Sequence, residues 1–434
     1  MSELNSELPI EEQDTTVIEK IKHLPRNIWV VSATSFFMDI SSEMVLSILP
    51  LYLSTVLGVK ANIIGLIEGV AEATASILKL FSGWLSDRLG SRKWLAVAGY
   101  GLSALAKPFF YIAQSWEAVA GIRWADRIGK GVRTAPRDAL VADNVKPHQR
   151  GLAFGLHRAA DTAGAMLGIL IAVLIVSQIK ARTGTDTLTR GTFQTIVLVS
   201  MIPAILAVLV LAIGTKESKP TGKSKQLRIT FKGLGKPFAM FMLIVGLFDL
   251  GNSSDAFLIL RAENVGMNLV NILIMLAVFN LIYALISTPA GILSDRIGRR
   301  KVIIGGWIVY ALIYLGFALA KAPVAIWLLY VTYGIYYGMA YGTAKAMISD
   351  IVPYDMRGTA FGTYNGILGI LDFPASLIAG LLWSGLGSWQ GFGPSAPFYF
   401  GAIMATIAVV LFVLWKPNLS GIQTEPLAEQ SLNN

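Results

Sequence analysis

Long apolar stretches alternate with short polar ones along almost the whole chain. About twelve of the apolar stretches approach the roughly 20 residues that a helix needs to cross the hydrocarbon core of a bilayer. A soluble core does not require apolar runs of this length. The pattern therefore predicts an all-α membrane protein with twelve transmembrane helices.

The composition supports a membrane protein and excludes some kinds of site. Hydrophobic residues make up 54% of the 434 residues and charged residues only 15%, and the mean hydropathy is +0.60. A soluble protein of this size would need far more polar surface. Cysteine is absent, so no disulfide framework or thiolate metal site is expected. The first 26 residues are acidic and polar, unlike a cleavable signal peptide, so we expect the first span itself to direct insertion.

The net charge of +9 reflects membrane topology rather than a nucleic-acid partner. If both termini lie on one side of twelve spans, that side holds most of the lysines and arginines, and the opposite side holds few. The basic side includes the turn after the second span (Arg88 to Lys93), the turn after the eighth (Arg296 to Lys301) and the loop Lys216 to Lys236. The positive-inside rule therefore predicts a multi-pass inner-membrane protein with both termini in the cytoplasm.

The sequence contains two internal repeats at nearly one offset. The segment Gly83 to Lys93 recurs as Gly291 to Lys301, 208 residues later, and Asp143 with the following Arg150-Gly151 recurs 207 residues later. Such agreement indicates a duplicated six-helix unit. We therefore expect a cytoplasmic tail (1–26), a first six-helix bundle (27–214), a basic cytoplasmic linker (215–236), a second six-helix bundle (237–416) and a C-terminal cytoplasmic tail (417–434).

The Gly-x-x-x-Asp-Arg-x-Gly-x-Arg-Lys turn between the second and third spans resembles the signature of the major facilitator superfamily, and its echo after the eighth span strengthens the resemblance. The run Asp126 to Asp138 is similar to a poorly characterised prokaryotic branch that we associate loosely with metal-resistance exporters. Those exporters carry histidine-rich tails, whereas this chain has three histidines and none in its tail. The resemblance implies a secondary transporter, and we expect neither a resident metal nor a cofactor.

The repeated turn has a physical role that its residue types suggest. Glycine lets a neighbouring helix approach closely. A carboxylate at a helix end can meet the positive N-terminus of another helix, and the arginines can pair with acids nearby. We expect these contacts to form when the cytoplasmic side closes and to break when it opens, although basic residues could simply anchor topology. The predicted gating residues are Gly83, Asp87, Arg88, Gly90, Arg92, Asp143, Gly291, Asp295, Arg296, Gly298, Arg300 and Asp350.

Many charged residues fall inside the predicted spans, where they are costly and usually face a cavity or a partner. The charges of the fourth span occupy one helical arc, which must face the protein interior. Counting about 1.5 Å per residue places Asp39 about 16 Å deep, near the bilayer midplane. Static ion pairs are the alternative for any single charge, and helix packing is the alternative for the tyrosines of the tenth span. The predicted cavity residues are Asp39, Glu43, Glu72, Arg123, Arg127, Lys130, Arg158, Asp161, Asp249 and Tyr337.

The sequence predicts secondary active transport of a small molecule or ion by alternating access. The nucleotide-binding loop Gly-x-x-x-x-Gly-Lys-Ser/Thr is absent, so we expect an ion gradient to drive transport, with protons as the coupling ion. We expect export in preference to uptake. We expect Asp39 and Arg127 to be coupled in one cavity, because nearby charge and burial both control carboxyl protonation. The alternatives are an uptake permease for an anionic metabolite or siderophore, and an acyl-transfer enzyme that uses His157 and Asp161. The expected partners are the substrate, protons and the lipid bilayer, with a monomeric protein.

Overall fold

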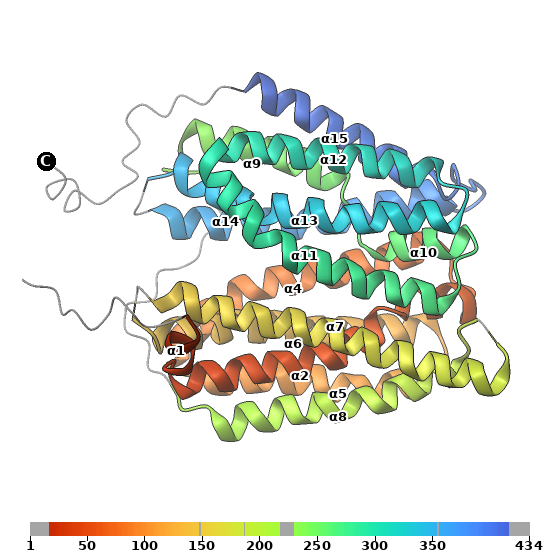
Figure 1. Cartoon of the computed structure of the whole chain (residues 1–434), viewed down its shortest axis with the longest axis horizontal. Helices are drawn as coiled ribbons and strands as arrows, with labels where there is room; N and C mark the ends of the chain where they lie inside the picture. The colour runs from red at the N-terminus through yellow and green to blue at the C-terminus, as the bar shows by residue number, and fades with distance from the viewer. Residues whose placement is uncertain (1–16, 147–148, 186, 218–229, 354–355, 416–434) are drawn as a thin grey trace, which may run out of the picture.

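The computed structural model describes residues 17–146, 149–185, 187–217, 230–353 and 356–415. Within these ranges the chain is helical apart from short connections and one isolated bridge between Leu386 and Trp389. A short helix, α1 (Val17–Lys22), precedes two bundles that lie side by side (Figure 1). The described chain begins and stops at the same end of the molecule, which we call the terminal end; the opposite end is the far end.

The first bundle holds six long helical elements that run alternately between the two ends. The first of them bends as it approaches the far end, where a short helix and a π-helical turn extend it. The elements are α2 (Arg26–Leu46) with α3 (Leu49–Leu51) and η2 (Tyr52–Val56), α4 (Ala61–Leu89), α5 (Lys93–Ile112), α6 (Trp116–Asp143), α7 (Arg150–Thr183) and α8 (Arg190–Gly214).

The second bundle repeats this plan, with one difference in its first element. That element is broken into two helices. The second elements, α4 and α11, are both 29 residues long, whereas α7 (34 residues) and α8 (25 residues) are longer than α14 (28 residues) and α15 (19 residues). The elements are α9 (Gly235–Leu250) with α10 (Ala256–Asn264), α11 (Leu269–Ile297), α12 (Arg299–Leu319), α13 (Pro323–Ile351), α14 (Arg357–Ser384) and α15 (Ala396–Leu414).

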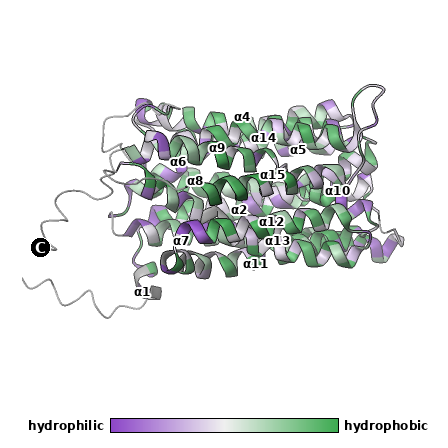
Figure 2. Ribbon diagram, turned by 90° about the horizontal axis from the view of Figure 1, so that it is seen from above, coloured by the Kyte–Doolittle hydropathy of each residue, from purple (hydrophilic) through white to green (hydrophobic). Residues whose placement is uncertain are grey.

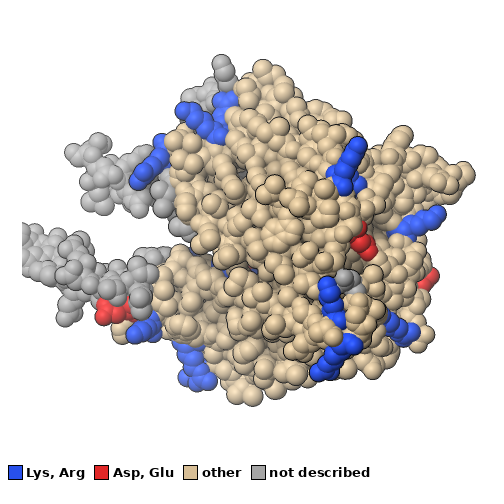
Figure 3. All heavy atoms as spheres, turned by 45° about the vertical axis from the view of Figure 1, so that its right-hand side comes forward, with Lys and Arg blue, Asp and Glu red and all other residues tan. Residues whose placement is uncertain are grey.

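Most of the long helices are long and apolar enough to span a bilayer. Nine of them, among the described residues, pass by length and hydropathy alone. The three remaining elements are α4 and α6, which carry many charges, and the broken α9–α10 pair. Figure 2 shows apolar residues along the middle of the helices, and Figure 3 shows charged side chains gathered toward the two ends of the molecule with a broad belt between them that lacks charge. The predicted twelve-helix, two-bundle membrane fold is confirmed.

The two halves meet mainly toward the far end. There α4 packs against α14, and α10 packs against α3 and α4, while α7 packs against α11. The Asn62 backbone N–H donates to Ser384 Oγ over 2.9 Å, and its side-chain amide donates to the Gly385 carbonyl over 2.8 Å. The Ser54 hydroxyl donates to Glu263 over 3.1 Å. Toward the terminal end the helices of the two halves lie further apart (Figure 1).

Small residues allow the close α4–α14 contact. A Cβ added at Gly65 would collide with the backbone carbonyl of Ser376, and one added at Gly69 would come within 2.9 Å of the Phe373 carbonyl oxygen. On the facing helix, a Cβ at Gly380 would come within 2.7 Å of the Ala61 carbonyl oxygen. In a bilayer such backbone proximity is a main source of helix association, because lipid offers no hydrophobic drive between apolar helices.

Candidate functional site: a charged cavity between the two halves

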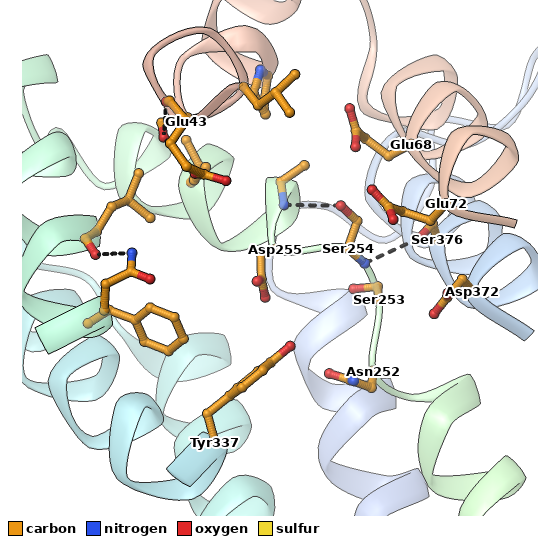
Figure 4. Close-up of a pocket in the computed structure, with 18 of the residues that line it drawn as sticks. Glu43, Glu68, Glu72, Asn252, Ser253, Ser254, Asp255, Tyr337, Asp372 and Ser376 are labelled. Atoms are coloured by element: carbon orange, nitrogen blue, oxygen red, sulfur yellow. Dashed lines mark hydrogen bonds between the residues drawn. The ribbon is translucent and has the colours of Figure 1, made fainter. Parts of the chain in front are cut away.

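A cavity of about 570 Å³ lies between the halves, with walls from both of them. Figure 4 shows its acidic side chains converging from several elements: Glu43 from α2, Glu68 and Glu72 from α4, Asp255 from the start of α10, and Asp372 from α14. The basic side chains that line it are Arg123, Arg127 and Lys130 of α6 and Arg158 of α7. A cavity of this size in mid-bundle can hold a small solute, and its charges can orient one.

The wall formed by α4 and α6 is a buried network of alternating charge. Arg123 binds Glu68 through two nitrogens, at 2.7 Å and 3.2 Å, and reaches Glu72 at 3.3 Å. Arg127 also lies 3.3 Å from Glu72, and Asp126 lies 3.7 Å from Arg127. The side chains of Arg123 and Glu68 are only 5% and 7% exposed. Both arginines are thus neutralised by acids of their own half.

The other cationic groups of α6 divide between burial and the cavity. Arg133 is buried, donates to Ser103 over 2.8 Å and lies 4.4 Å from the centre of the Tyr100 ring. Lys130 is exposed and lines the cavity. The charged arc of α6 therefore faces the protein and its cavity, as its helical periodicity requires.

The break between α9 and α10 forms part of the wall on the side of the second half. Asn252, Ser253 and Ser254 have no helical structure there, and together with Asp255 they line the cavity (Figure 4). The Ser254 N–H donates to Ser376 of α14 over 3.2 Å, and Tyr333 donates its hydroxyl to Asp255 over 3.1 Å. Unwound backbone inside a membrane is tolerated only where protein or a water-filled cavity satisfies its polar groups. Such broken helices mark binding regions in many transporters.

Sequence analysis predicted that Asp39 and Arg127 are coupled in one cavity, and the structure gives the two residues different charged neighbours. Arg127 is held by Glu72 and Asp126. The charged neighbours of Asp39 are Asp161, Arg133, Glu43 and Lys130. Asp39 lies one helical turn from Glu43 on α2 and is not among the residues that line the central cavity.

The predicted cavity residues of α7 occupy two different places. Arg158 lines the cavity and donates to the Tyr283 hydroxyl of α11 over 2.9 Å, which joins the halves at mid-depth. Asp161 lies 3.7 Å from the buried His157 on the same helix. His157 is buried, and its contact with Asp161 joins residues that lie about one turn apart on α7.

Asp249 lies in a second cavity, of about 240 Å³, inside the second half. Tyr337, Asn252 and Asp372 line both cavities. Of the predicted tyrosine stripe, Tyr330 also lines the first cavity, whereas Tyr333 is fully buried among aromatic rings. Some tyrosines of the stripe therefore line a cavity, and others pack between helices. The side chain of Tyr341 lies outside the described residues.

The first signature turn is organised around Arg92. Its guanidinium lies 2.8 Å from Asp87 and 2.5 Å from Asp143, so it joins the ends of α4 and α6. Glu217, which follows α8, accepts the backbone N–H groups of Arg92 and Lys93 over 2.8 Å and 2.9 Å. Gly90 ends α4 in the left-handed conformation, with φ of 63°. These bonds join elements of the first half to one another and to the segment that follows α8, and they are present while the halves are apart at this end. The gating role stays a prediction.

The second signature turn uses different partners. Arg299, rather than Arg300, pairs with Asp350 at 2.9 Å. Arg300 donates to the carbonyls of Phe412, Val413 and Trp415 at the end of α15, the closest at 2.5 Å. Gly298 has φ of 92° and separates α11 from α12. The side chain of Asp295 and the surroundings of Gly291 lie outside the described residues, as does most of the basic linker.

The remaining turn positions have simple surroundings. Gly83 and Arg296 lie within the last two turns of α4 and the last turn of α11 respectively. Arg88 lies 5.3 Å from the centre of the Trp84 ring, one turn away on the same helix.

Several residues of the site were not singled out from the sequence. Glu68, Asp255 and Asp372 were recognised only as charges within spans, and Glu217 only as part of a loop. The helix break had a local signal in Gly251-Asn252-Ser253-Ser254-Asp255, five consecutive poor helix formers inside an otherwise apolar span.

Known proteins resemble the chain in sequence and in fold. The family model described as Major Facilitator Superfamily matches residues 31–371 and 238–431. An uncharacterised MFS-type transporter of Methanocaldococcus jannaschii is 35% identical over 401 residues, covering 91% of this chain and 96% of that protein. A cis,cis-muconate transport protein of Acinetobacter baylyi is 24% identical, covering 77% of this chain and 82% of that protein. The multidrug resistance protein MdtG of Enterobacter lignolyticus is 23% identical, covering 89% of this chain and 90% of that protein.

A solved structure with the same fold is a bacterial homologue of the human lysosomal transporter Spinster, described as inward-facing and occupied. It superposes with a TM-score of 0.73 at 15% identity and covers 90% of this chain and 98% of that chain. The family match over most of the chain, the 35% identical relative and the two six-helix halves around a charged cavity together show that the chain belongs to the major facilitator superfamily of transporters.

Proposed function

We propose that the chain is a proton-coupled exporter of a small solute that works by alternating access in the plasma membrane. The central cavity carries this proposal, because it lies between two halves that meet at the far end and separate toward the terminal end. The positive-inside rule assigns the terminal end to the cytoplasm. The conformation is then open to the cytoplasm, the side from which an exporter loads.

The coupling proton requires a carboxyl group that is free to change its charge. Glu68 and Glu72 are tied to arginines, so their charge is compensated in place. Glu43 lines the cavity, and its nearest described polar contact is the Ser47 hydroxyl at 3.4 Å. Asp39 lies one turn away and faces Asp161 as well as cations. We therefore assign proton coupling to Asp39 and Glu43 on α2, with Arg127 in the fixed network.

An uptake permease for an anionic metabolite is the second candidate. Lys130 and Arg158 line the cavity and would attract an anion. The named relatives do not decide between the two, because one is a transport protein for cis,cis-muconate and another a multidrug resistance protein. Export of a cation or neutral solute fits better, because Arg123 and Arg127 are neutralised while Glu43, Asp255 and Asp372 line the same space.

Everted membrane vesicles test direction and coupling together. Respiration acidifies their interior, and a fluorescent amine reports the pH gradient. We expect tetraethylammonium, used as a cationic probe, to dissipate the gradient in vesicles that contain the protein and not in vesicles without it. Asp39→Asn should abolish this response, because the variant cannot carry the proton, and Glu43→Gln should reduce it.

Two results would overturn the proposal. Tetraethylammonium flux that is equal with and without the gradient would exclude proton coupling. Gradient-driven accumulation of succinate in right-side-out vesicles, without any cation response in everted ones, would establish the uptake permease instead. A growth screen of a deletion strain against drugs, metals, organic acids and siderophores would identify the natural substrate.

A further inference from the structure

The second half contains a cavity of its own, beside the central one. It has a volume of about 240 Å³ and lies among α9, α12, α13 and α14, with one lining residue, Ser76, from α4. It is lined by two acids, Asp249 and Asp372, and by a set of aromatic rings. No lysine or arginine is among its described lining residues.

Asp249 is buried and incompletely partnered. Asp249 is the second-last residue of α9 and is 9% exposed, and its Oδ2 atom has no hydrogen-bond partner among the described groups. The nearby Asn252 side chain binds the carboxyl group. A buried oxygen of this kind is costly unless something else satisfies it. A bound cation would do so.

The aromatic walls favour an organic cation over a metal ion. Phe248 and Trp307 stack with ring centres 4.8 Å apart, and Tyr336 lies 6.1 Å from Phe248. Tyr364 completes the lining on α14. Ring faces attract ammonium groups, and clusters of such faces recognise alkylated ammonium ligands. Among the described residues there is no group of three or more acidic, histidine or cysteine ligands that would suit a metal.

The helix break adds negative potential at the same place. The C-terminal end of α9 at Leu250 leaves carbonyl groups beyond the last helical hydrogen bonds, and this end of a helix carries partial negative charge. Tyr310 already donates to the Gly251 carbonyl over 3.1 Å. The C-terminal end of α9 and the two carboxylates therefore all contribute negative potential to this cavity.

We propose that this cavity is a binding site for a small organic ammonium ion, with Asp249 and Asp372 as counter-ions and Phe248, Trp307 and Tyr336 as its aromatic wall. The inference deepens the proposed function, on which it rests, by naming a substrate class. Asp372 and Asn252 line both cavities, so a ligand can pass from the central cavity to this site along groups that are shared.

Equilibrium binding to the purified full-length protein tests the site without any gradient. The probe is radiolabelled tetraethylammonium, measured with wild type and with Asp249→Asn, Asp372→Asn and Trp307→Leu. Each substitution should weaken binding roughly tenfold or more, because each removes a counter-ion or a ring face. The matched control is Glu117→Gln, which neutralises an exposed acid in the first turn of α6, outside the linings of both cavities, and should leave binding unchanged.

A second measurement uses only the wild-type protein, so it tests the site even if the variants fail to fold. In wild-type protein, a hydrophobic carbodiimide should modify Asp249, and tetraethylammonium should protect it, as read by mass spectrometry of the modified peptide. Sodium at equal concentration should not protect. Protection by sodium alone would make this an alkali-cation site and overturn the proposal.

Absence of wild-type binding and of protection, or unchanged binding in both aspartate variants, would also overturn the proposal. None of these outcomes would affect the vesicle result. Conversely, binding that survives in Asp39→Asn while transport is uncoupled would support both.

Discussion

Arg123 is the residue on which the cavity wall depends most directly. It contacts Glu68 and Glu72 on α4, and both it and Glu68 are almost wholly buried. A buried ion pair contributes little net stability compared with an apolar pair, because desolvation offsets the attraction between its charges. Removal of one partner is different, since it leaves the other charge buried and unpaired. Loss of Arg123 alone should therefore weaken the contact between α4 and α6.

We expect Arg123→Met to destabilise the protein by about 3–5 kcal/mol, the usual cost of leaving a buried charge without its partner. The thermal midpoint of the detergent-purified protein would report this. Glu68→Gln combined with Arg123→Met should recover much of the loss. Arg158→Met serves as the matched control, because Arg158 is exposed to the cavity. Equal midpoints for Arg123→Met and wild type would show that the network does not support the fold.

At the scale of elements, the signature turn joins four helix ends of the first half. Arg92 reaches the ends of α4 and α6, and Glu217 connects the segment after α8 to the first N–H groups of α5. An acid at these N–H groups also meets the positive end of the helix dipole. The turn therefore holds the terminal-end face of the first half as one unit, and we predict that this unit contacts the second half when that end closes.

Asp87→Asn tests this role of the turn. Arg92 keeps Asp143 in the variant, so the protein should fold, whereas the closed state loses the negative charge of Asp87. We expect slower transport and faster reaction of a cysteine introduced at Ser253 with an impermeant maleimide added from the terminal side. The chain has no natural cysteine, so the label reports this position alone. Unchanged transport and unchanged labelling in both Asp87→Asn and Asp295→Asn would contradict the gating role.

For the whole molecule, the arrangement of the halves defines one conformation of a cycle. The halves are joined at the far end by Ser54 with Glu263 and by Asn62 with Ser384 and Gly385. The α4–α14 contact relies on glycines that bring backbones together. To open the far end, the protein must break these contacts, and contacts at the terminal end must replace them. Transport should therefore stop when the far end is locked.

A disulfide across the far end tests this requirement. In the variant that combines Asn62→Cys with Ser384→Cys, oxidation should abolish transport, and a reductant should restore it. Each single cysteine variant should transport under both conditions and is the control. Transport that continues in the fully cross-linked protein, verified by gel mobility after cleavage in the linker, would show that the far end does not open.

The sequence by itself determined the fold class and the duplicated plan. Long apolar runs leave a helix as the means of satisfying the backbone in lipid, and the repeated turn identifies matching halves. It also indicated that the charges of α6 face inward, because their period is that of a helix face. These conclusions depend on local spacing along one chain, which sequence records directly.

Only the tertiary structure decided which charges pair and where the cavities lie. Arg127 binds Glu72 rather than Asp39, and Asp350 binds Arg299 rather than Arg300. Depth along a helix does not specify rotation or the lateral position of neighbours, and ion pairing depends on both. The break before Asp255 likewise needs Ser376 and Tyr333 from other helices to satisfy its polar groups. Such partners are brought together by packing between helices far apart in sequence, so residue spacing alone cannot identify them.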